Sequence, residues 1–225
     1  NPLHRPLSKP VKAILIGAGN RGNIYADYAL IYPNELNIIG VADQNAVRNG
    51  RFARKHNIAA ANRFYNWEDV FARDKFADAV IIATPDALHA APCLRALDAG
   101  YDVLLEKPIA LTEADCRLIH EKAKATGRIV GVCHVLRYSP YFKQLKEIIT
   151  SGTIGDIVSV QHMEPIGFDH MAHSYVRGNW HNSTKSSPII LAKSCHDTDI
   201  LRWLIDEPVE DIQCFGGLRL FTKEN

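Results

Sequence analysis

No apolar run in this sequence approaches the roughly 18 residues that a membrane-spanning helix needs, and no signal peptide is visible. Charge of either sign is not in excess, because 26 Lys and Arg stand against 25 Asp and Glu, for a formal net charge of +1. Proteins that bind nucleic acid or anionic membranes usually carry a basic patch or stripe. We therefore expect neither partner, and a small molecule is the ligand class that this composition favours.

Cysteine is scarce and its spacing matches no disulfide framework. The five thiols are odd in number, widely separated and contain no CxxC pair; they are Cys93, Cys116, Cys133, Cys195 and Cys214. This usage is typical of reduced thiols, so we expect a cytoplasmic protein. The chain opens at Asn1 without a Met, so removal of an upstream targeting segment stays open. The histidines of the second half offer His-x-x-His spacing at best, which predicts no metal site.

A glycine-rich turn near the start of the chain carries the first positive signal. An apolar run at residues 11–16, typical of a buried strand, leads directly into the GxGxxG motif of residues 17–22. Such glycines permit a tight turn, close approach of a phosphate and close packing of strand on helix, while the following helix offers N–H groups to an anion. The motif predicts a dinucleotide pyrophosphate site formed by Gly17, Gly19, Asn20, Arg21 and Gly22.

An acid at the end of the next predicted strand, residues 37–43, indicates which dinucleotide binds. Asp43 follows Gly22 by 21 residues, close to the spacing at which a carboxylate meets the adenosine ribose hydroxyls. A carboxylate there repels a 2′-phosphate, so NAD is favoured over NADP. Arg48 and Arg51 follow soon after and could reach a phosphate, which moderates this preference. The alternative is that Asp43 only caps the next helix.

Strands and helices then alternate in the manner of an α/β doubly wound parallel sheet. After an irregular arm over residues 1–10, we expect a nucleotide-binding Rossmann domain over residues 11–135. Residues 136–225 form a second region, in which the pattern predicts strands over 157–162 and 209–221, a long polar loop over 163–188 and a helix over 188–205. These elements make a poor domain by themselves, so we expect the second domain to be truncated.

Ligands of open parallel sheets bind beyond the carboxyl ends of the strands. Predicted strand ends carry Thr84 and Pro85 with His89 nearby, then Glu106 and Lys107. Lys107 is the candidate catalytic group, because a crevice beside a positively charged nicotinamide lowers the pKa of an ammonium. The alternative is an ordinary surface lysine.

The predicted helix over 188–205 offers further polar groups. At 3.6 residues per turn, Ala192, Lys193 and Asp199 share the face of His196. The alternative is that His196 and Asp199 form a structural pair at a domain seam. Asn179, Trp180 and His181 provide either a sugar-stacking edge or simple packing.

Together these motifs resemble the glucose-fructose oxidoreductase, inositol dehydrogenase and MocA (Gfo/Idh/MocA) family. The resemblance implies an α+β second domain with an open, mostly antiparallel sheet, which forms the substrate floor and a homo-oligomer interface. It implies hydride exchange between NAD and a secondary hydroxyl of a sugar, cyclitol or glycoside. In this pattern Lys107 orients the reacting oxygen, His196 is the general acid or base and Asp199 supports it. Arg137 and Tyr138 line the pocket.

One position departs from the family pattern. Many members have Asp four residues before the histidine, and here that residue is Ala192, followed by Lys193. Either Lys193 replaces the missing group as a second cation near the alkoxide, or proton transfer uses His196 alone. The lysine-bearing version resembles a branch associated with glycosides, so an NAD-retaining glycosidase is the main alternative to a dehydrogenase. A non-catalytic nucleotide-sensing regulator is a second alternative, disfavoured because Lys107 and His196 are both present.

Overall fold

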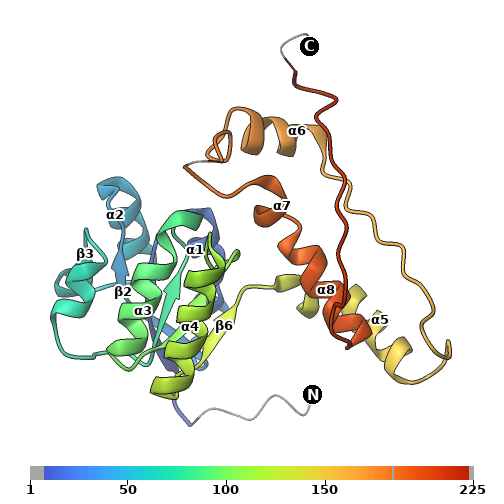
Figure 1. The fold of residues 1–225 in the computed structure, drawn as a ribbon. Helices are drawn as coiled ribbons and strands as arrows, with labels where there is room; N and C mark the ends of the chain where they lie inside the picture. The colour runs from blue at the N-terminus through green and yellow to red at the C-terminus, as the bar shows by residue number, and fades with distance from the viewer. Residues whose placement is uncertain (1–7, 184, 223–225) are drawn as a thin grey trace. The chain divides into compact units, whose positions relative to one another are not determined.

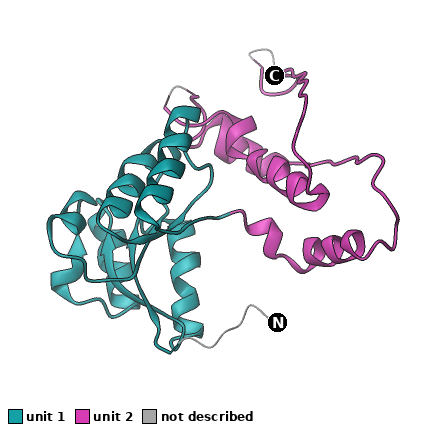
Figure 2. Cartoon of the chain, turned by 60° about the horizontal axis from the view of Figure 1, so that its bottom comes forward, with its two compact units in different colours: residues 1–133 teal, residues 134–225 magenta. Residues whose placement is uncertain are grey.

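The computed structural model describes residues 8–183 and 185–222. Contacts divide the chain into two compact units, residues 1–133 and residues 134–225 (Figure 2). Most of the predicted irregular arm, residues 1–7, lies outside the described part. Within that part, no helix is both long and apolar enough to cross a membrane.

The first unit is built on a parallel sheet of six strands in the order β3-β2-β1-β4-β5-β6. The strands are β1 Val11–Ile16, β2 Leu36–Ala42, β3 Arg63–Phe64, β4 Ala79–Ile82, β5 Asp102–Leu105 and β6 Val130–Val132. The order reverses between β1 and β4, which is the topological switch point of a doubly wound sheet. The predicted α/β parallel fold is therefore confirmed for this unit.

Helices cover both faces of this sheet (Figure 1). The α-helices are α1 Asn20–Ile31, α2 Ala46–Lys55, α3 Ala90–Asp98 and α4 Glu113–Thr126, and the 3-10 helices are η1 Ala60–Asn62, η2 Glu68–Ala72 and η3 Asp86–Leu88. One buried cluster joins the sheet to α1 and α2, and another joins it to α3 and α4. Thr112 caps α4 by accepting the N–H of Asp115, and Gly127 ends the helix with a φ of 63°.

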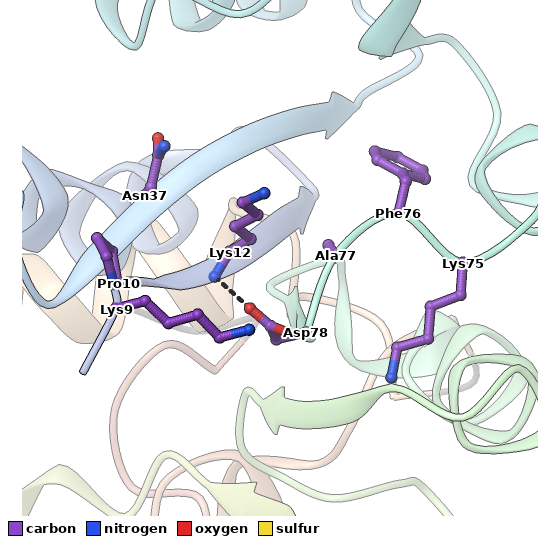
Figure 3. Close-up of a pocket in the computed structure, with 8 residues that line it drawn as sticks. All are labelled: Lys9, Pro10, Lys12, Asn37, Lys75, Phe76, Ala77 and Asp78. Atoms are coloured by element: carbon purple, nitrogen blue, oxygen red, sulfur yellow. Dashed lines mark hydrogen bonds between the residues drawn. The ribbon is translucent and has the colours of Figure 1, made fainter. Parts of the chain in front are cut away.

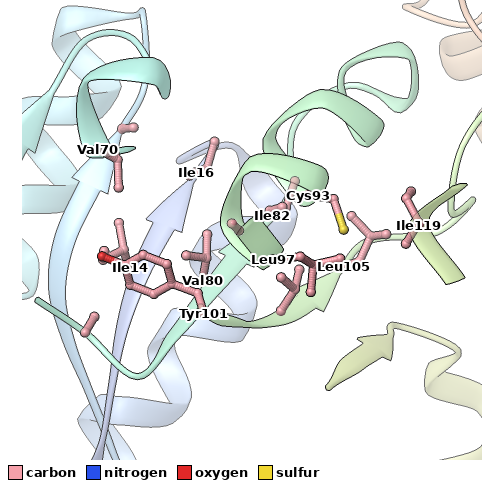
Figure 4. Close-up of a cluster of buried hydrophobic side chains, with 14 of the residues drawn as sticks. Ile14, Ile16, Val70, Val80, Ile82, Cys93, Leu97, Tyr101, Leu105 and Ile119 are labelled. Carbon is pink, nitrogen blue, oxygen red and sulfur yellow. The ribbon is translucent and has the colours of Figure 1, made fainter. Parts of the chain in front are cut away.

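The core explains why the central strands are almost continuously apolar. In β1, Ala13 and Leu15 belong to the cluster on one face, whereas Ile14 and Ile16 belong to the cluster on the other. Alternate side chains of a strand point to opposite faces, so a strand covered on both sides must be apolar throughout. Figure 4 shows Cys93 and Leu97 of α3 packed against Val80, Ile82 and Leu105 of the sheet.

Strand register places the carboxyl ends in one row. Ile16 pairs with Ala42 on one side and with Ile82 on the other, and Leu105 pairs with Ile82 and with Val132. The residues that follow these ends therefore lie along a single edge of the sheet. This edge carries the glycine turn, Asp43, Thr84 and Glu106.

The second unit is mainly helical in this chain. Its elements are η4 Val135–Tyr138, α5 Pro140–Thr150, α6 Phe168–Met171, the π-helical turn η5 Ala172–Val176, α7 Ile189–Ala192 and α8 Cys195–Ile205. Ser139 caps α5 by accepting the N–H of Phe142, and Pro140 occupies the first helical position, where proline is well tolerated.

The strands predicted over residues 157–162 and 209–221 are not formed. Both segments lack strand pairing, and Val158 and Phe215 within them are 96% and 91% exposed. A strand is stable only beside a hydrogen-bonded neighbouring strand. The described part of this unit contains no strand that could pair with either segment. The antiparallel sheet expected here is thus absent from the described residues, and the homo-oligomer expected through it stays a prediction.

The single helix predicted over residues 188–205 is also wrong. The chain forms α7, breaks at Lys193 and Ser194, and resumes as α8. At the break the N–H of His196 donates to the carbonyl of Lys193, three residues back rather than four. Ser194 and Cys195 are weak helix formers, which fits an interruption at this point.

Candidate functional site

The turn between β1 and α1 is shaped by its glycines. A Cβ at Gly17 would lie 2.6 Å from the carbonyl oxygen of Ala83, and one at Gly22 would lie 2.1 Å from that of Gly17. Neither position tolerates a side chain. A Cβ at Gly19 would meet no atom within 4 Å, and Gly19 caps α1 without a side-chain hydrogen bond. The turn therefore leaves open space at the positive end of α1, which suits a pyrophosphate.

Asp43 follows β2 on the same edge and is 7% exposed. Its Oδ2 accepts the N–H of Ala18 at 2.8 Å, and its Oδ1 accepts the N–H of Asn45 at 2.8 Å. Arg48 donates to both oxygens, from Nε at 3.2 Å and from Nη2 at 3.0 Å. The cap of α2 is Asn45, whose side chain accepts the N–H of Arg48. Asp43 is therefore tied to the glycine turn and is not the helix cap.

Glu106 and Lys107 follow β5. Glu106 is 6% exposed, and its carboxylate accepts the hydroxyl of Tyr25 at 2.7 Å and the N–H of Lys107 at 2.5 Å. Arg21 lies 3.9 Å from the same carboxylate. Burial and the neighbouring Glu106 raise the pKa of Tyr25, so its hydroxyl stays protonated and donates. These contacts fix the backbone from which the half-buried Lys107 side chain starts.

His89 connects two loops at this edge. The ring is 0% exposed; its Nδ1 lies 2.7 Å from the carbonyl oxygen of Pro108 and its Nε2 lies 3.0 Å from that of Thr84. Thr84 also donates its hydroxyl to the carbonyl of Leu88. Pro85 is exposed beside it. A ring this buried acts on a ligand only through the backbone that it holds.

In the second unit, the face of α8 joins several predicted residues. Arg137 forms a double hydrogen bond with Asp199, from Nε at 2.8 Å and from Nη2 at 2.5 Å. This pairing raises the pKa of the Arg137 guanidinium above its ordinary value. The Nδ1 atom of His134 lies 3.9 Å from Asp199, and its ring stands edge-on to the ring of His196 with centroids 6.1 Å apart. Arg137, Asp199 and His196 thus form one cluster with His134.

Lys193 belongs to a second polar group. Its ammonium lies 2.8 Å from Glu164, and His162 Nε2 lies 2.8 Å from Asp197, which is 9% exposed. One ligand atom each of His162, Glu164 and Asp197 lie within 4.8 Å of one another, close enough for one metal ion. The ammonium of Lys193 already supplies a positive charge to Glu164, so we interpret this group as an ion-pair network.

The remaining predicted substrate residues are more exposed. Tyr138 is 72% exposed, and the ammonium of Lys143 lies 5.9 Å from its ring centroid. The ring of Trp180 lies 6.2 Å from that of Tyr175, and His181 contacts the carbonyl of Gly178 at 2.6 Å. The ring of Trp180 thus has a neighbour within its own segment, and its role, whether toward a substrate or in packing, stays a prediction.

A cavity of about 500 Å³ lies at the opposite edge of the sheet (Figure 3). It is lined by Lys9, Pro10, Lys12, Asn37, Lys75, Phe76, Ala77 and Asp78. These residues precede or begin strands, and the backbone N–H of Lys12 donates to Asp78. Because ligands of such sheets bind at the carboxyl ends, this cavity is separate from the candidate site.

Comparison with known protein families agrees with this geometry. Residues 11–134 match the model described as an oxidoreductase family with an NAD-binding Rossmann fold, and residues 142–224 match the Gfo/Idh/MocA C-terminal domain. The chain belongs to the Gfo/Idh/MocA family. The resemblance seen in the motifs is thereby confirmed, and the first unit is the NAD-binding Rossmann domain of this family.

Individual relatives are similar over most of this chain. Inositol 2-dehydrogenase of Rubrobacter xylanophilus is 28% identical over 216 residues, covering 93% of this chain and 56% of that protein. The structure of myo-inositol 2-dehydrogenase from Lactobacillus plantarum matches with a TM-score of 0.76 and 21% identity, over 88% of this chain and 57% of that one. The WlbA dehydrogenase of Bordetella pertussis, solved with NADH and UDP-GlcNAcA, gives 0.72 and 21%, over 88% and 58%. This chain therefore spans little more than half of each relative.

Several partners of the predicted site residues were not found from the sequence. In the first unit Tyr25 contacts Glu106, and in the second unit Glu164 pairs with Lys193 and Asp197 with His162. None of these three partners stands in a recognised motif. The alternation of His162 and Glu164 in an extended segment was a usable signal, since residues two apart in such a segment share a side. Tyr25 had no comparable signal, because its partner Glu106 is 81 residues away.

Proposed function

We propose that the protein is an NAD-dependent oxidoreductase that transfers a hydride between nicotinamide and a secondary hydroxyl of a sugar, cyclitol or glycoside. The observation that carries this proposal is the fixation of Glu106 and Lys107 at the carboxyl edge of the parallel sheet, where ligands of such sheets bind. Tyr25 and the N–H of Lys107 hold the Glu106 carboxylate, so the lysine side chain starts from a defined point. The relatives named inositol 2-dehydrogenase, and a similar structure of a dehydrogenase with bound UDP-GlcNAcA, support the substrate class.

Different groups take part in the transfer of the hydride and in the transfer of the proton. NAD, when bound, supplies the acceptor for the hydride that leaves the carbinol carbon. Lys107 donates a hydrogen bond to the reacting oxygen and stabilises the negative charge that develops there. His196 accepts the hydroxyl proton, and the reverse reaction returns it. Asp199 and Arg137 hold this end of α8 through their paired hydrogen bonds.

A second candidate function is an NAD-retaining glycosidase. The observation that favours it lies four residues before His196, where Ala192 stands in place of the Asp of many family members. Lys193 follows it, and its ammonium lies 2.8 Å from Glu164. In this reaction, oxidation of a ring carbinol acidifies the neighbouring C–H, and loss of that proton expels the aglycone. Water then adds, and the hydride returns to the sugar. The carboxylate of Glu164 is a suitable proton acceptor within this group.

The two functions are separated by one experiment on the full protein. It is incubated with NAD and a panel of inositols, free sugars and nitrophenyl glycosides, while NADH absorbance and nitrophenol release are followed together. The proposed dehydrogenase accumulates NADH in step with ketone. The glycosidase releases nitrophenol with no net NADH. A protein that does neither over the whole panel contradicts both assignments.

A further inference from the structure

The carboxylate of Asp43 is already saturated by donors from the protein. Four N–H groups point at it, from Ala18, from Asn45 and twice from Arg48. A carboxylate offers about four lone-pair positions. The two backbone donors belong to the glycine turn and to the start of α2, so only the arginine side chain can give way. A ribose diol that binds Asp43 must therefore displace Arg48.

Arg48 lies where negative charge is favoured. Its side chain is 55% exposed, and only two of the five N–H donors of a guanidinium are needed for Asp43. It stands in the first turn of α2, whose positive dipole end attracts anions. The ten residues of α2 contain Arg48, Arg51, Arg54 and Lys55 and no acidic residue.

We propose that Arg48 forms a site for a phosphate monoester beside Asp43, so that the protein binds NADP as well as NAD. Arg48 neutralises the carboxylate that by itself repels a 2′-phosphate, and its outward N–H groups bind that phosphate. Arg51, three residues later on the same helix, adds a second positive charge at the same end. With NAD, the ribose hydroxyls take the place of Arg48 on Asp43. The inference requires dinucleotide binding but neither of the reactions proposed above.

The test isolates the 2′-phosphate from the rest of the cofactor. Dissociation constants of the full chain are measured by calorimetry for adenosine 2′,5′-bisphosphate and for 5′-AMP, and then for NADP and NAD. We expect the two members of each pair to bind within about tenfold of each other. Arg48→Gln should weaken the bisphosphate and NADP about 10- to 100-fold, as expected for loss of charge-assisted hydrogen bonds. It should not weaken 5′-AMP or NAD, because their ribose hydroxyls no longer have to displace Arg48 from Asp43.

Two further variants make the result specific. Arg48→Lys keeps the charge but loses the planar fork, so it should fall between wild type and Arg48→Gln. Arg54→Gln, an exposed arginine in the last turn of α2, should leave the ratio of the two affinities unchanged. Thermal melts verify that each variant is folded. If Arg48→Gln is not folded, Arg48→Lys is compared with wild type instead.

Two outcomes overturn the proposal. One is wild-type binding of the bisphosphate more than about tenfold weaker than that of 5′-AMP. The other is an equal loss of affinity for both nucleotides in Arg48→Gln, which makes Arg48 a structural partner of Asp43. Both are binding results, so they remain distinct from a failure to oxidise any sugar.

Discussion

The two units of this chain differ in whether their predicted strands are paired. In residues 1–133, all six strands are paired, and Leu15, Val80 and Leu97 are 0% exposed. In residues 134–222, two predicted strands are unpaired, and Val158 and Phe215 are almost fully exposed. Helices such as α8 satisfy their own backbone, whereas a strand depends on a neighbour. The polar contacts that α8 carries are therefore formed in the second unit, although the sheet expected there is not.

The sharpest way to test the contribution of the first unit is to remove Lys107. Lys107→Met should lower turnover by about a thousandfold, because it removes the group that we propose stabilises charge on the reacting oxygen. NAD affinity, measured by fluorescence titration, should change little. Lys124→Met, at an exposed lysine in the last turn of α4, is the matched control and should behave as wild type. Retained turnover in Lys107→Met would make Lys107 an ordinary surface lysine.

The next largest difference between the units is expected in the stability effect of removing an apolar side chain. Leu97→Ala removes a fully buried side chain from the cluster shown in Figure 4 and should destabilise the protein by about 2–5 kcal/mol. Val158→Ala removes a side chain that is 96% exposed and should change stability by less than about 0.5 kcal/mol. Urea denaturation measures both. Equal losses would mean that Val158 is covered in the protein in solution.

Thiol reactivity offers a further contrast. Burial raises the pKa of Cys93 to about 12 and that of Cys133 to about 11, whereas Cys214 is exposed. Only the thiolate reacts, so at pH 8 iodoacetamide should label Cys214 at least about a hundredfold faster than either buried thiol. Labelling of Cys133 should rise as the pH rises toward its pKa. Mass spectrometry of the peptides gives the rates, and fast labelling of Cys93 would contradict the buried core.

The smallest effect is expected at the ion pair of Lys193 and Glu164. The two side chains are 23% and 36% exposed, and such pairs are worth roughly 0.2–1 kcal/mol. A double-mutant cycle of Glu164→Gln and Lys193→Met, read by urea denaturation, should give a coupling energy in this range. A coupling energy of several kcal/mol would show that the pair is shielded from water. It would then contribute more to the stability of the second unit than its exposure indicates.

Prediction from the sequence succeeded where the signal was local. The strand and glycine turn of residues 11–22, the acid at position 43 and the strand ends at 84 and 106 follow from patterns within a few residues. It failed for residues 157–162 and 209–221, because alternation in a sequence predicts a strand without saying what pairs with it. It also missed the break at Lys193 and Ser194, since periodicity does not reveal a local change from four-residue to three-residue hydrogen bonding.

The sequence by itself determined the family, the parallel doubly wound fold of the first unit and the set of residues worth testing, because each is written in short motifs at fixed spacing. The tertiary structure decided their partners. It placed Arg48 on Asp43, Tyr25 on Glu106, Arg137 on Asp199 and Glu164 on Lys193. Such pairings arise from side chains that meet only after the chain has folded, and they decide which charges in each unit remain available to a ligand.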